Sequence, residues 1–530
     1  MIATSQPLAS AAGLRVMHEG GNAIDAAITA AAVLAVVEPN MNGIGGDLFA
    51  LVYNARTQTL RGLNASGRSA YATTPGFFAD HSMTKVPDVG VYSVSVPGAV
   101  DGWSTLLSTY GTISLSRALE PAIRYAREGF PVSEIISKGW RESEPKLSAD
   151  PVAALTFLPG GRAPSPGDVF CNKNLARTLQ QIAEGGRDVF YKGSIGAAII
   201  ADLKARGGLL DARDLAEHMS DWIEPISTTY RGYTVYELPP NTQGFVALEM
   251  LNILEGFDIA SLGHNSAEYL HLLVEAKRIA FADRSAHLAD FDRVPSALLE
   301  TLVSKEYAAT RRAEIDLNRA AASYRPGATS GIPRGARPES AENLTGLDRG
   351  DTVYMTVADR EGNAVSLIQS LFAGFGSGLV AGETGIVLHN RGSLFNLIAG
   401  HPNEVAPHTR PMHTLIPAFV MKDGKPWFSF GVMGGDHQAQ GHVQVLVNLI
   451  DFGMNVQEAG EAARVNHGSD GLQVERGVPA AARAGLTARG HEVTESAGTY
   501  GGYQGIRIDV ETGVLMGGSD PRKDGMAVGY

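Results

Sequence analysis

A threonine and a serine lie at the open end of a predicted β-hairpin, where their hydroxyl groups could carry out nucleophilic chemistry. Two strand-like segments, 352–358 and 364–372, flank a five-residue turn at 359–363. If the residues on either side of this turn pair, the register places Thr352 opposite Ser370. A shift of one residue in this register is the alternative, and the sequence does not decide between the two.

Thr352 would gain a catalytic base of its own if the chain were cut between Asp351 and Thr352. The new α-amine would have a reference pKa of about 7.7–8.0, close to the neutral pH at which a general base works well. It could take the proton of the threonine's own hydroxyl, so no histidine–aspartate triad is needed. Ser370 would hydrogen-bond that hydroxyl. From the pattern alone, an ordinary threonine at the start of a β-strand is the commoner explanation.

Other catalytic and metal-binding motifs do not occur in the sequence. There is no G-x-S-x-G elbow, no H-E-x-x-H and no cluster of Cys and His with zinc spacing. The glycine pairs that begin at Gly43 and Gly374 lack the third glycine of a dinucleotide-binding loop and are explained as turns. The single cysteine, Cys171, excludes an internal disulfide and is expected to be a small buried side chain. We therefore expect no metal and no cofactor.

Helical and strand-like segments indicate how the chain positions these residues. Helical spacing is found at 8–18 and 23–37, with Asn22 as the N-cap of the second helix. The glycine-rich turn 43–47 then leads into a strand at 48–53. Further helices are predicted at 118–128, 174–184, 195–206, 267–283 and 440–452, further strands at 233–238, 384–388, 418–421 and 427–430, and an exposed loop at 320–348. Strands with helices on both sides predict a layered α/β architecture.

The composition is that of a globular protein and excludes some function classes. The 530 residues are 44% hydrophobic and 19% charged. The formal net charge is -12 and there is no basic run, so nucleic acid is not expected as a partner. The first ten residues lack the features of a signal peptide, and the longest apolar stretch, 26–37, is too short to span a bilayer. We therefore expect a cytoplasmic protein without a membrane partner.

Several longer blocks of sequence accompany the hairpin, from near residue 2 to the last residue. They read SQPLASAAGLRVMHEGGNAIDAAITAA, GIGGDLFALVY, ALEPAIRYAREGFPVS, GDTVYMTVADREGNAVSLIQSLFAGFGSGLV, RPMHTLIPAFV, GVMGG and GSDPRKDGMAVGY. In this order they resemble the gamma-glutamyltransferases, a family of N-terminal-nucleophile hydrolases whose small subunit begins with a threonine at the start of such a hairpin.

The resemblance implies a four-layer αββα sandwich that cuts itself between Asp351 and Thr352. The products would be a large subunit, 1–351, and a small catalytic subunit, 352–530. Together they would form one folded unit, a heterodimer of its own two fragments, which could in turn form a dimer. The family's nucleophile falls on Thr352, and the expected partner is a small-molecule amide.

The resemblance also implies roles for residues around the nucleophile. The hydroxyl partner of the nucleophile falls on Ser370, where the family has threonine. The oxyanion hole, made of two backbone N–H groups, falls on Gly434 and Gly435, because glycine lets the backbone approach the developing oxyanion closely. His413 and Thr414 stand where the family usually has a pair of serines near the substrate carboxylate.

The substrate contacts of the family are replaced in this sequence. Family members hold the α-amino group of a γ-glutamyl substrate with polar and acidic side chains, and the matching positions are Phe372, Arg391 and Leu394. An ammonium group there would meet an aromatic ring, a like charge and no carboxylate, which is unfavourable for a buried charge. The arginine that binds the substrate carboxylate aligns with Ser66, and Arg68 is a candidate to replace it. The alternative is that these arginines are ordinary surface residues.

Two classes of function are consistent with the sequence. The leading hypothesis is a gamma-glutamyltransferase or glutathione hydrolase that acts through an acyl-enzyme on its N-terminal threonine. Within the same class, Arg391 favours hydrolysis of another anionic amide, such as oxamate or a glutaryl or cephalosporin-type amide. The second class is a non-catalytic binding protein on the same fold, against which the joint presence of Thr352, Ser370 and Gly434-Gly435 argues.

The segment 396–409 bears on access to the nucleophile. It contains two prolines and one glycine, and in lidded members of the family a longer loop at this place covers the pocket. We therefore expect an open cleft with Thr352 visible to solvent. Water would compete well with amine acceptors in such a cleft, which favours hydrolysis over transfer.

Overall fold

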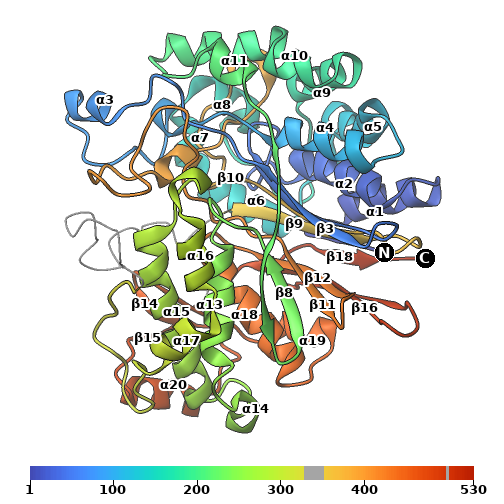
Figure 1. The fold of residues 1–530 in the computed structure, drawn as a ribbon. Helices are drawn as coiled ribbons and strands as arrows, with labels where there is room; N and C mark the ends of the chain where they lie inside the picture. The colour runs from blue at the N-terminus through green and yellow to red at the C-terminus, as the bar shows by residue number, and fades with distance from the viewer. Residues whose placement is uncertain (328–350, 497–499) are drawn as a thin grey trace.

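Two antiparallel β-sheets, stacked face to face, form the centre of the molecule (Figure 1). The structure is a computed structural model that describes residues 1–327, 351–496 and 500–530. From edge to edge, the first sheet contains β18 (Met526–Val528), β1 (Ile2–Thr4), β9 (Asp351–Ala358), β10 (Ala364–Phe372), β2 (Asp47–Asn54), β3 (Thr59–Ala65) and β6 (Asp221–Ile223). The second contains β17 (Leu515–Ser519), β16 (Gly502–Ile508), β12 (Lys425–Met433), β11 (Ala418–Lys422), β8 (Tyr233–Glu237) and β7 (Ile226–Tyr230).

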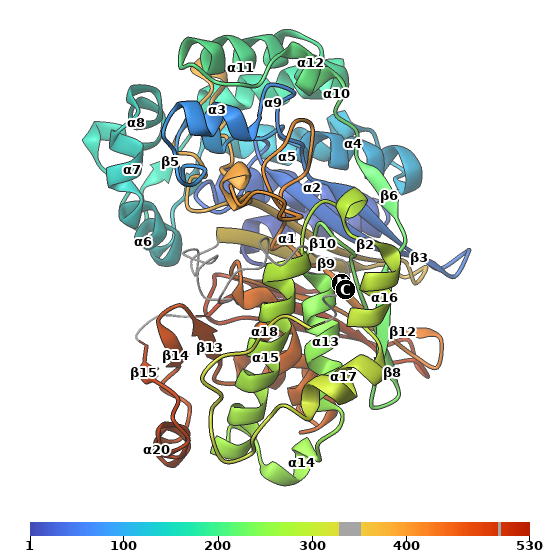
Figure 2. The same cartoon turned by 60° about the vertical axis from the view of Figure 1, so that its left-hand side comes forward.

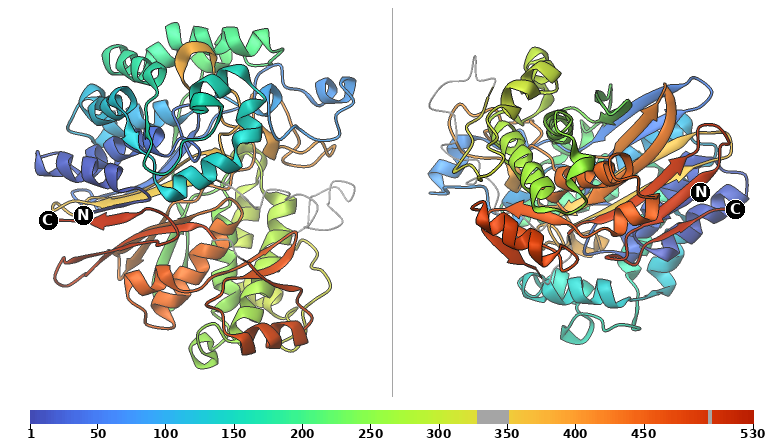
Figure 3. Two further views of the ribbon diagram at one scale, coloured as in Figure 1. Left: turned by 180° about the vertical axis from the view of Figure 1, so that it is seen from behind. Right: turned by 90° about the horizontal axis from the view of Figure 1, so that it is seen from below.

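Helices cover the outer face of each sheet, which gives four layers in the order α, β, β, α (Figures 1 and 3). The first sheet is covered by α2 (Ala23–Val37) and α4 (Ala99–Tyr110), with α5 (Leu115–Glu128) packed on α2. The second is covered by α13 (Gly244–Leu254) and α18 (His437–Ile450), with α15 (Ala267–His287) packed on α13. Apolar side chains fill all three spaces between these layers. Val353 packs between the first sheet and its helices, and Tyr354 and Phe419 pack between the two sheets. Phe430 packs between the second sheet and its helices. The predicted four-layer sandwich is confirmed.

Shorter elements extend the two halves. On the side of the first sheet they are α1 (Pro7–His18), α3 (Pro75–Asp80), α6 (Glu134–Glu142), α7 (Glu144–Ser148), α8 (Pro151–Phe157), α9 (Lys173–Gly185), α10 (Arg187–Tyr191), α11 (Ser194–Ala205), α12 (Ala212–Ala216) and the antiparallel pair of β4 (Phe130–Pro131) and β5 (Val169–Phe170) (Figure 2). On the other side they are α14 (Ile259–Leu262), α16 (Ser296–Leu302), α17 (Lys305–Arg312), α19 (Val456–Glu461), α20 (Ala480–Ala488) and a small sheet of β13 (Val465–Gly468), β14 (Gly471–Val474) and β15 (Val493–Glu495).

The two ends of the chain meet at one edge of the first sheet. Strand β1 pairs with β18, so that Ile2 lies opposite Val528 (Figure 3). On its other side β1 pairs with β9, the strand that contains Thr352. Within the described residues, none of the helices combines the length and the apolar character needed to cross a membrane.

Most predicted elements occur, and two predictions are wrong. Helix α2 has the predicted bounds, and the Asn22 side chain accepts hydrogen bonds from its first turn as predicted. The segment 384–388 is not a strand: its only pairing is a single bridge between Val380 and Val387, because it runs through a buried turn instead of along a sheet edge. Cys171 is exposed, since it directly follows the short surface strand β5. Most of the predicted loop 320–348 lies outside the described residues.

Candidate active site

Thr352 and Ser370 lie together at the open end of the β9–β10 hairpin. The two strands pair in the predicted register from Ala358 to Val353, after which a β-bulge shifts the register by one residue. The Thr352 hydroxyl donates to the Ser370 hydroxyl at 3.2 Å. Ser370 Oγ in turn donates to the carbonyl oxygen of Asp351 at 2.7 Å. The predicted register therefore holds up to Val353 and the predicted contact of the two hydroxyls is present, although the bulge displaces the direct pairing of Thr352 with Ser370. The two hydroxyls form a chain that ends on the peptide bond before Thr352.

The alternation of β9 directs Thr352 toward the second sheet. Two residues further on, Tyr354 packs on Gly431 of β12, where an added Cβ would lie 2.4 Å from the tyrosine ring. Thr356 hydrogen-bonds Ser429 of the same strand at 2.7 Å. Because side chains at every second position share one face of a strand, Thr352 faces the end of β12. Gly434 and Gly435 follow directly after that end.

Gly434 and Gly435 have an unusual backbone with free donors. Their φ angles are 121° and 58°, so a side chain at Gly434 would be strained. Their carbonyls accept hydrogen bonds from His437 and Gln438 in the first turn of α18. Within the described ranges, neither glycine's amide N–H donates a hydrogen bond. Two free N–H groups at a helix N-terminus suit an anionic oxygen.

Asp47 organises the neighbouring part of the site. It lies opposite Ser370 in the β10–β2 pairing and is fully buried. Its carboxylate accepts hydrogen bonds from His413 Nε2 at 3.0 Å and Arg391 Nε at 3.2 Å. The Gly67 N–H donates to its other oxygen at 3.3 Å. The Asp47 carboxylate is therefore occupied by the protein's own donors.

The electrostatics of this cluster keep Arg391 charged and His413 neutral. Burial alone would raise the pKa of Asp47, but the surrounding His389, His413 and Arg391 outweigh it and the pKa lies below its usual range. Burial, and then the charge of Arg391, lowers the pKa of His413 to about 3. Burial lowers the pKa of Arg391 to about 10, which leaves the guanidinium charged at neutral pH.

Arg391 has one donor that the protein does not use. Its Nη1 donates to Thr414 Oγ1 at 3.1 Å, and the guanidinium lies 4.4 Å from the centre of the Phe372 ring. Its Nη2 is buried and has no hydrogen-bond partner among the described residues. Leu394, also buried, follows on the same turn as Arg391. A buried guanidinium nitrogen without a partner is a position where a ligand anion would fit.

Arg68 lies apart from this cluster. Its guanidinium is 3.6 Å from the carboxylate of Asp221, and its side chain is partly exposed. Ser66, which precedes it by two residues, hydrogen-bonds Asn64 at 2.7 Å. Among the candidate residues, the structure thus brings together Thr352, Ser370, Phe372, Arg391, His413 and Thr414, whereas the Arg68 side chain turns to Asp221.

Thr352 is buried in the uncut chain. Its exposed fraction is 1%, so the expectation of a solvent-visible Thr352 is wrong for this form. The physical reason is that Thr352 is an internal residue of a central strand whose side chain points between the two sheets. The segment 396–409 forms a bridge of its own, Asn396 with Glu404, and the preceding Phe395 shares a small apolar cluster with Phe78.

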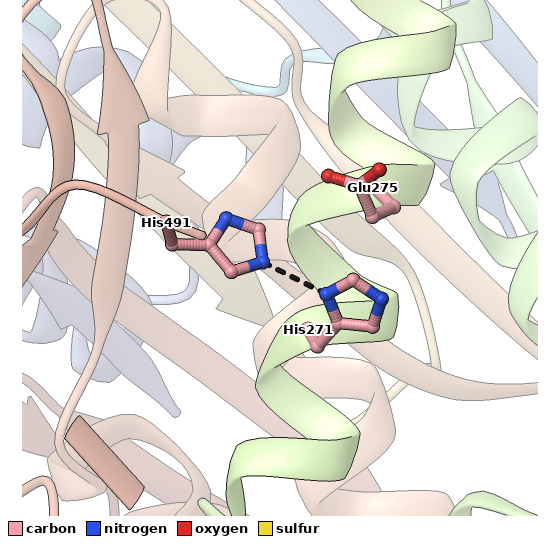
Figure 4. Close-up of side chains that lie close together, drawn as sticks. All are labelled: His271, Glu275 and His491. Carbon is pink, nitrogen blue, oxygen red and sulfur yellow. Dashed lines mark hydrogen bonds between the residues drawn. The ribbon is translucent and has the colours of Figure 1, made fainter. Parts of the chain in front are cut away.

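His271, Glu275 and His491 are the group of described residues whose side chains could hold a metal ion (Figure 4). His271 Nδ1 and His491 Nε2 are 2.8 Å apart, whereas two nitrogens on a tetrahedral zinc would be about 3.3 Å apart. His271 Nε2 donates to the carbonyl of Asp316, so its Nδ1 accepts from His491. Glu275 accepts a hydrogen bond from Arg278 at 2.9 Å. These contacts describe a hydrogen-bonded structural network, and we assign no metal to it.

Asp47 is the residue that sequence reasoning missed. It appeared there only as the end of a glycine-rich turn before an apolar strand. The available signal was its position: a carboxylate at the first residue of a strand that is buried on both faces requires partners. The identity of those partners, Arg391 and His413, is not contained in the local sequence.

The four layers, the hairpin threonine with its hydroxyl partner and the free N–H groups of Gly434 and Gly435 together define a self-processing amidohydrolase or acyltransferase of the N-terminal-nucleophile type. A family model described as gamma-glutamyltranspeptidase matches residues 9–530, and the chain belongs to this family.

Individual relatives match over the whole chain. It is 41% identical to the glutathione hydrolase-like YwrD proenzyme of Bacillus subtilis, covering 100% of this chain and 98% of the relative. It is 37% identical to the acylase ACY 1 proenzyme of Pseudomonas sp. strain SE83, covering 100% and 93%. Among solved structures, the cephalosporin acylase of Bacillus halodurans superposes with a TM-score of 0.91 at 41% identity, covering 100% and 95%.

Proposed function

We propose that this protein cuts itself between Asp351 and Thr352 and then hydrolyses amides whose acyl group ends in a carboxylate, of the glutaryl type. The observation that supports the substrate class is that the buried Nη2 of Arg391 has no hydrogen-bond partner in the described part of the chain. It lies in a cluster that is joined to the nucleophile hairpin through Asp47 and Phe372. The catalytic residue is Thr352.

Self-cleavage begins with the hydroxyl chain in the uncut protein. Thr352 Oγ attacks the carbonyl carbon of Asp351, and Ser370 Oγ donates to the carbonyl oxygen as negative charge develops on it. The C–O bond forms, the C–N bond breaks and the proton of the Thr352 hydroxyl ends on the Thr352 nitrogen, which leaves an ester on Thr352. Water hydrolyses the ester, frees the Asp351 carboxylate and leaves Thr352 with a hydroxyl and an α-amine.

The two fragments remain one body after the cut. In the first sheet, β9 and β10 of the second fragment lie between β1 and β2 of the first fragment. In the second sheet, β11 and β12 of the second fragment continue the pair β7 and β8 of the first. Separation would expose both sheets and the core between them, so a heterodimer of the fragments is the expected product.

Turnover uses the groups that the cut releases. The α-amine of Thr352 takes the proton of the hydroxyl, which attacks the amide carbonyl of the substrate. The N–H groups of Gly434 and Gly435 bind the developing oxyanion. The α-amine of Thr352 passes the proton to the leaving nitrogen of the substrate, which departs as a free amine. Water then hydrolyses the acyl-enzyme to release the carboxylic acid.

The α-amino group distinguishes the proposed substrates from γ-glutamyl compounds. An ammonium at this place would face Arg391, the Phe372 ring and Leu394. Asp47 could not compensate it, because its carboxylate is already engaged. An uncompensated buried charge costs about 3–5 kcal/mol, which is at least about 100-fold in an equilibrium constant. Gamma-glutamyl hydrolysis is the second candidate, favoured by the relationship to a glutathione hydrolase-like proenzyme.

Two chromogenic amides that differ only in the α-amino group test the proposal. Matured protein is assayed with glutaryl-p-nitroanilide and γ-glutamyl-p-nitroanilide, and with oxamate by ammonia release. We expect kcat/KM for the glutaryl compound to exceed that for the γ-glutamyl compound by about 100-fold or more. Equal or better turnover of the γ-glutamyl compound would restore the glutathione hydrolase assignment, and turnover of oxamate alone would indicate a shorter acyl group.

A further inference from the structure

The loop that carries the free N–H groups has little support from its own backbone. Gly434, Gly435 and Asp436 connect β12 to α18, and both glycines have positive φ angles. Glycine has the largest conformational freedom of any residue. Their carbonyls are bonded to the first turn of α18, but these bonds do not fix where the N–H groups point relative to Thr352.

A buried ion pair anchors this loop to helix α15. Arg284, on α15, makes a two-pronged contact with the Asp436 carboxylate, with Nη1 to Oδ1 at 2.6 Å and Nη2 to Oδ2 at 3.0 Å. The guanidinium lies 4.1 Å from the centre of the Phe281 ring. Both charged side chains are almost fully buried. Two parallel bonds to a planar carboxylate fix its orientation as well as its distance.

Gln243 links the ion pair to both halves of the site. Its Oε1 accepts from Arg284 at 2.7 Å. Its Nε2 donates to the carbonyl of Gly435 at 3.1 Å and to the carbonyl of Thr414 at 2.9 Å. The Gln243 backbone N–H donates to the carbonyl of His413 at 3.0 Å. One side chain therefore joins the loop of the oxyanion donors to the segment that contacts Asp47 and Arg391.

We propose that Arg284 is a positioning residue for the reaction. Through Asp436 and Gln243 it fixes the separation between the N–H pair of Gly434-Gly435 and the Arg391 subsite. This inference rests on the proposed function, in which the amide carbonyl and the acyl carboxylate of one substrate are bound at the same time. The distance between the two subsites then has to match the substrate. The rigid separation selects the length of the acyl chain.

The chemistry of the network argues for positioning over stability. A buried ion pair is often no more stabilising than apolar side chains of the same volume, so the fold alone does not require Arg284 with Asp436. A bidentate contact to Asp436, the residue that follows the two glycines, anchors a loop whose glycines leave the backbone flexible. Pre-aimed donors are effective because they need no reorganisation when the charge develops.

Three variants test the positioning role with glutaryl-p-nitroanilide as the probe. Arg284→Lys keeps the positive charge and loses the bidentate contact. Asp436→Asn keeps the side-chain shape and loses the negative charge. The double variant Arg284→Gln with Asp436→Asn replaces the ion pair by two amides. We expect kcat to fall about 10- to 100-fold, below the loss for removal of an oxyanion donor, with KM within about three-fold of wild type. Arg206→Gln, which breaks the ion pair with Asp150, is the matched control and should leave kcat unchanged.

Self-cleavage separates positioning from a general structural role. In the uncut chain the Asp351 carbonyl accepts from Ser370, so cleavage of the Arg284→Lys and Asp436→Asn chains should proceed within about three-fold of the wild-type rate. A purely structural role would slow cleavage and turnover together, and that result would overturn the proposal.

Hydrogen exchange gives a readout that needs no substrate. Amide exchange of a peptide covering 434–438, in which the N–H groups of His437 and Gln438 donate to the loop carbonyls, is followed in wild type and Arg284→Lys, with a peptide from α2 as the reference. We expect exchange in the loop to be at least about ten-fold faster in the variant, since a lost factor of ten corresponds to about 1.4 kcal/mol. Unchanged exchange would overturn the positioning role. If exchange is faster in Arg284→Lys but wild type does not hydrolyse glutaryl-p-nitroanilide, the positioning role is supported and the proposed substrate class is refuted.

Discussion

Substitution of Ser370 by alanine tests the chemistry of self-cleavage at a single atom. Ser370 Oγ accepts from Thr352 at 3.2 Å and from the Phe372 N–H at 2.7 Å, and it donates to the Asp351 carbonyl at 2.7 Å. The donated hydrogen bond strengthens as the carbonyl oxygen becomes an oxyanion. Removal of one such donor typically costs about 10²–10³-fold in rate, or about 2.7–4 kcal/mol.

The same substitution has a smaller effect on stability. The Phe372 N–H loses its Ser370 acceptor in a buried environment, which costs about 1–3 kcal/mol of the free energy of unfolding. The folded chain should therefore persist while its maturation slows. Ser370→Thr retains the hydroxyl and is the matched control, with a cleavage rate expected within a few-fold of wild type.

The assay is a time course of freshly purified chain by intact mass. Wild type should convert, without added protease, into fragments of 351 and 179 residues, from Met1 and from Thr352 onward. Thr352→Ala should stay a single chain of 530 residues, because no hydroxyl remains to attack. If Ser370→Ala matures as fast as wild type, Ser370 does not act on the carbonyl and the proposed hydroxyl chain is refuted.

Three further predictions concern the oxyanion site, the substrate site and the response to pH. Gly434→Ala should lower kcat by about 10²-fold, because φ at this position is 121° and a side chain there forces the N–H away; steady-state kinetics with wild-type kcat would contradict this. Arg391→Lys keeps a positive charge beside the Asp47 carboxylate but removes the Nη2 group that would bind the substrate carboxylate. KM for glutaryl-p-nitroanilide should therefore rise about ten-fold or more while kcat stays within a few-fold of wild type, and an unchanged KM would contradict this. The free energy of unfolding, measured with urea, should fall from pH 7 to pH 5, because burial lowers the pKa of His413, His437 and His442 to about 3. Between about pH 3 and pH 6.5 the unfolded chain therefore binds more protons than the folded chain. Each of these histidines changes the free energy of unfolding by about 1.4 kcal/mol per pH unit in this window. Glu38, whose pKa burial raises to about 7, opposes this trend together with Glu237 and Glu249, whose pKa burial raises well above its usual value. His218 and His491, whose pKa burial lowers to about 4, add to the trend, and a flat or rising stability would contradict the prediction.

The sequence predicts those parts of the fold that depend on neighbouring residues. Helix α2 follows from a local cap and an apolar run, and the β9–β10 register follows from one short turn. The segment 384–388 misled for the same reason: its β-branched, apolar residues read as a strand, but tertiary packing buries it as a turn. Local pattern and local structure agree only where no distant partner intervenes.

The contacts that complete the site join distant parts of the chain. Asp47 and Arg391 are 344 positions apart, and Arg284 and Asp436 are 152 apart. No periodicity connects such pairs, so the sequence offers single charged residues without their partners. The burial of Thr352 was also unpredictable, because the side chain's exposure depends on the second sheet, which forms from strands on both sides of residue 352.

The pairing of β1 with β18 allows the chain to be reconnected in another order. With Ile2 opposite Val528, a short linker from Tyr530 to Met1 would close the original ends across one sheet edge. A permuted gene could then begin at residue 352 and end at 351, with its start codon directly before Thr352. Once an aminopeptidase removes the initiator methionine, the nucleophile would be present without any internal cut. Such a single-chain enzyme would make catalysis measurable independently of maturation.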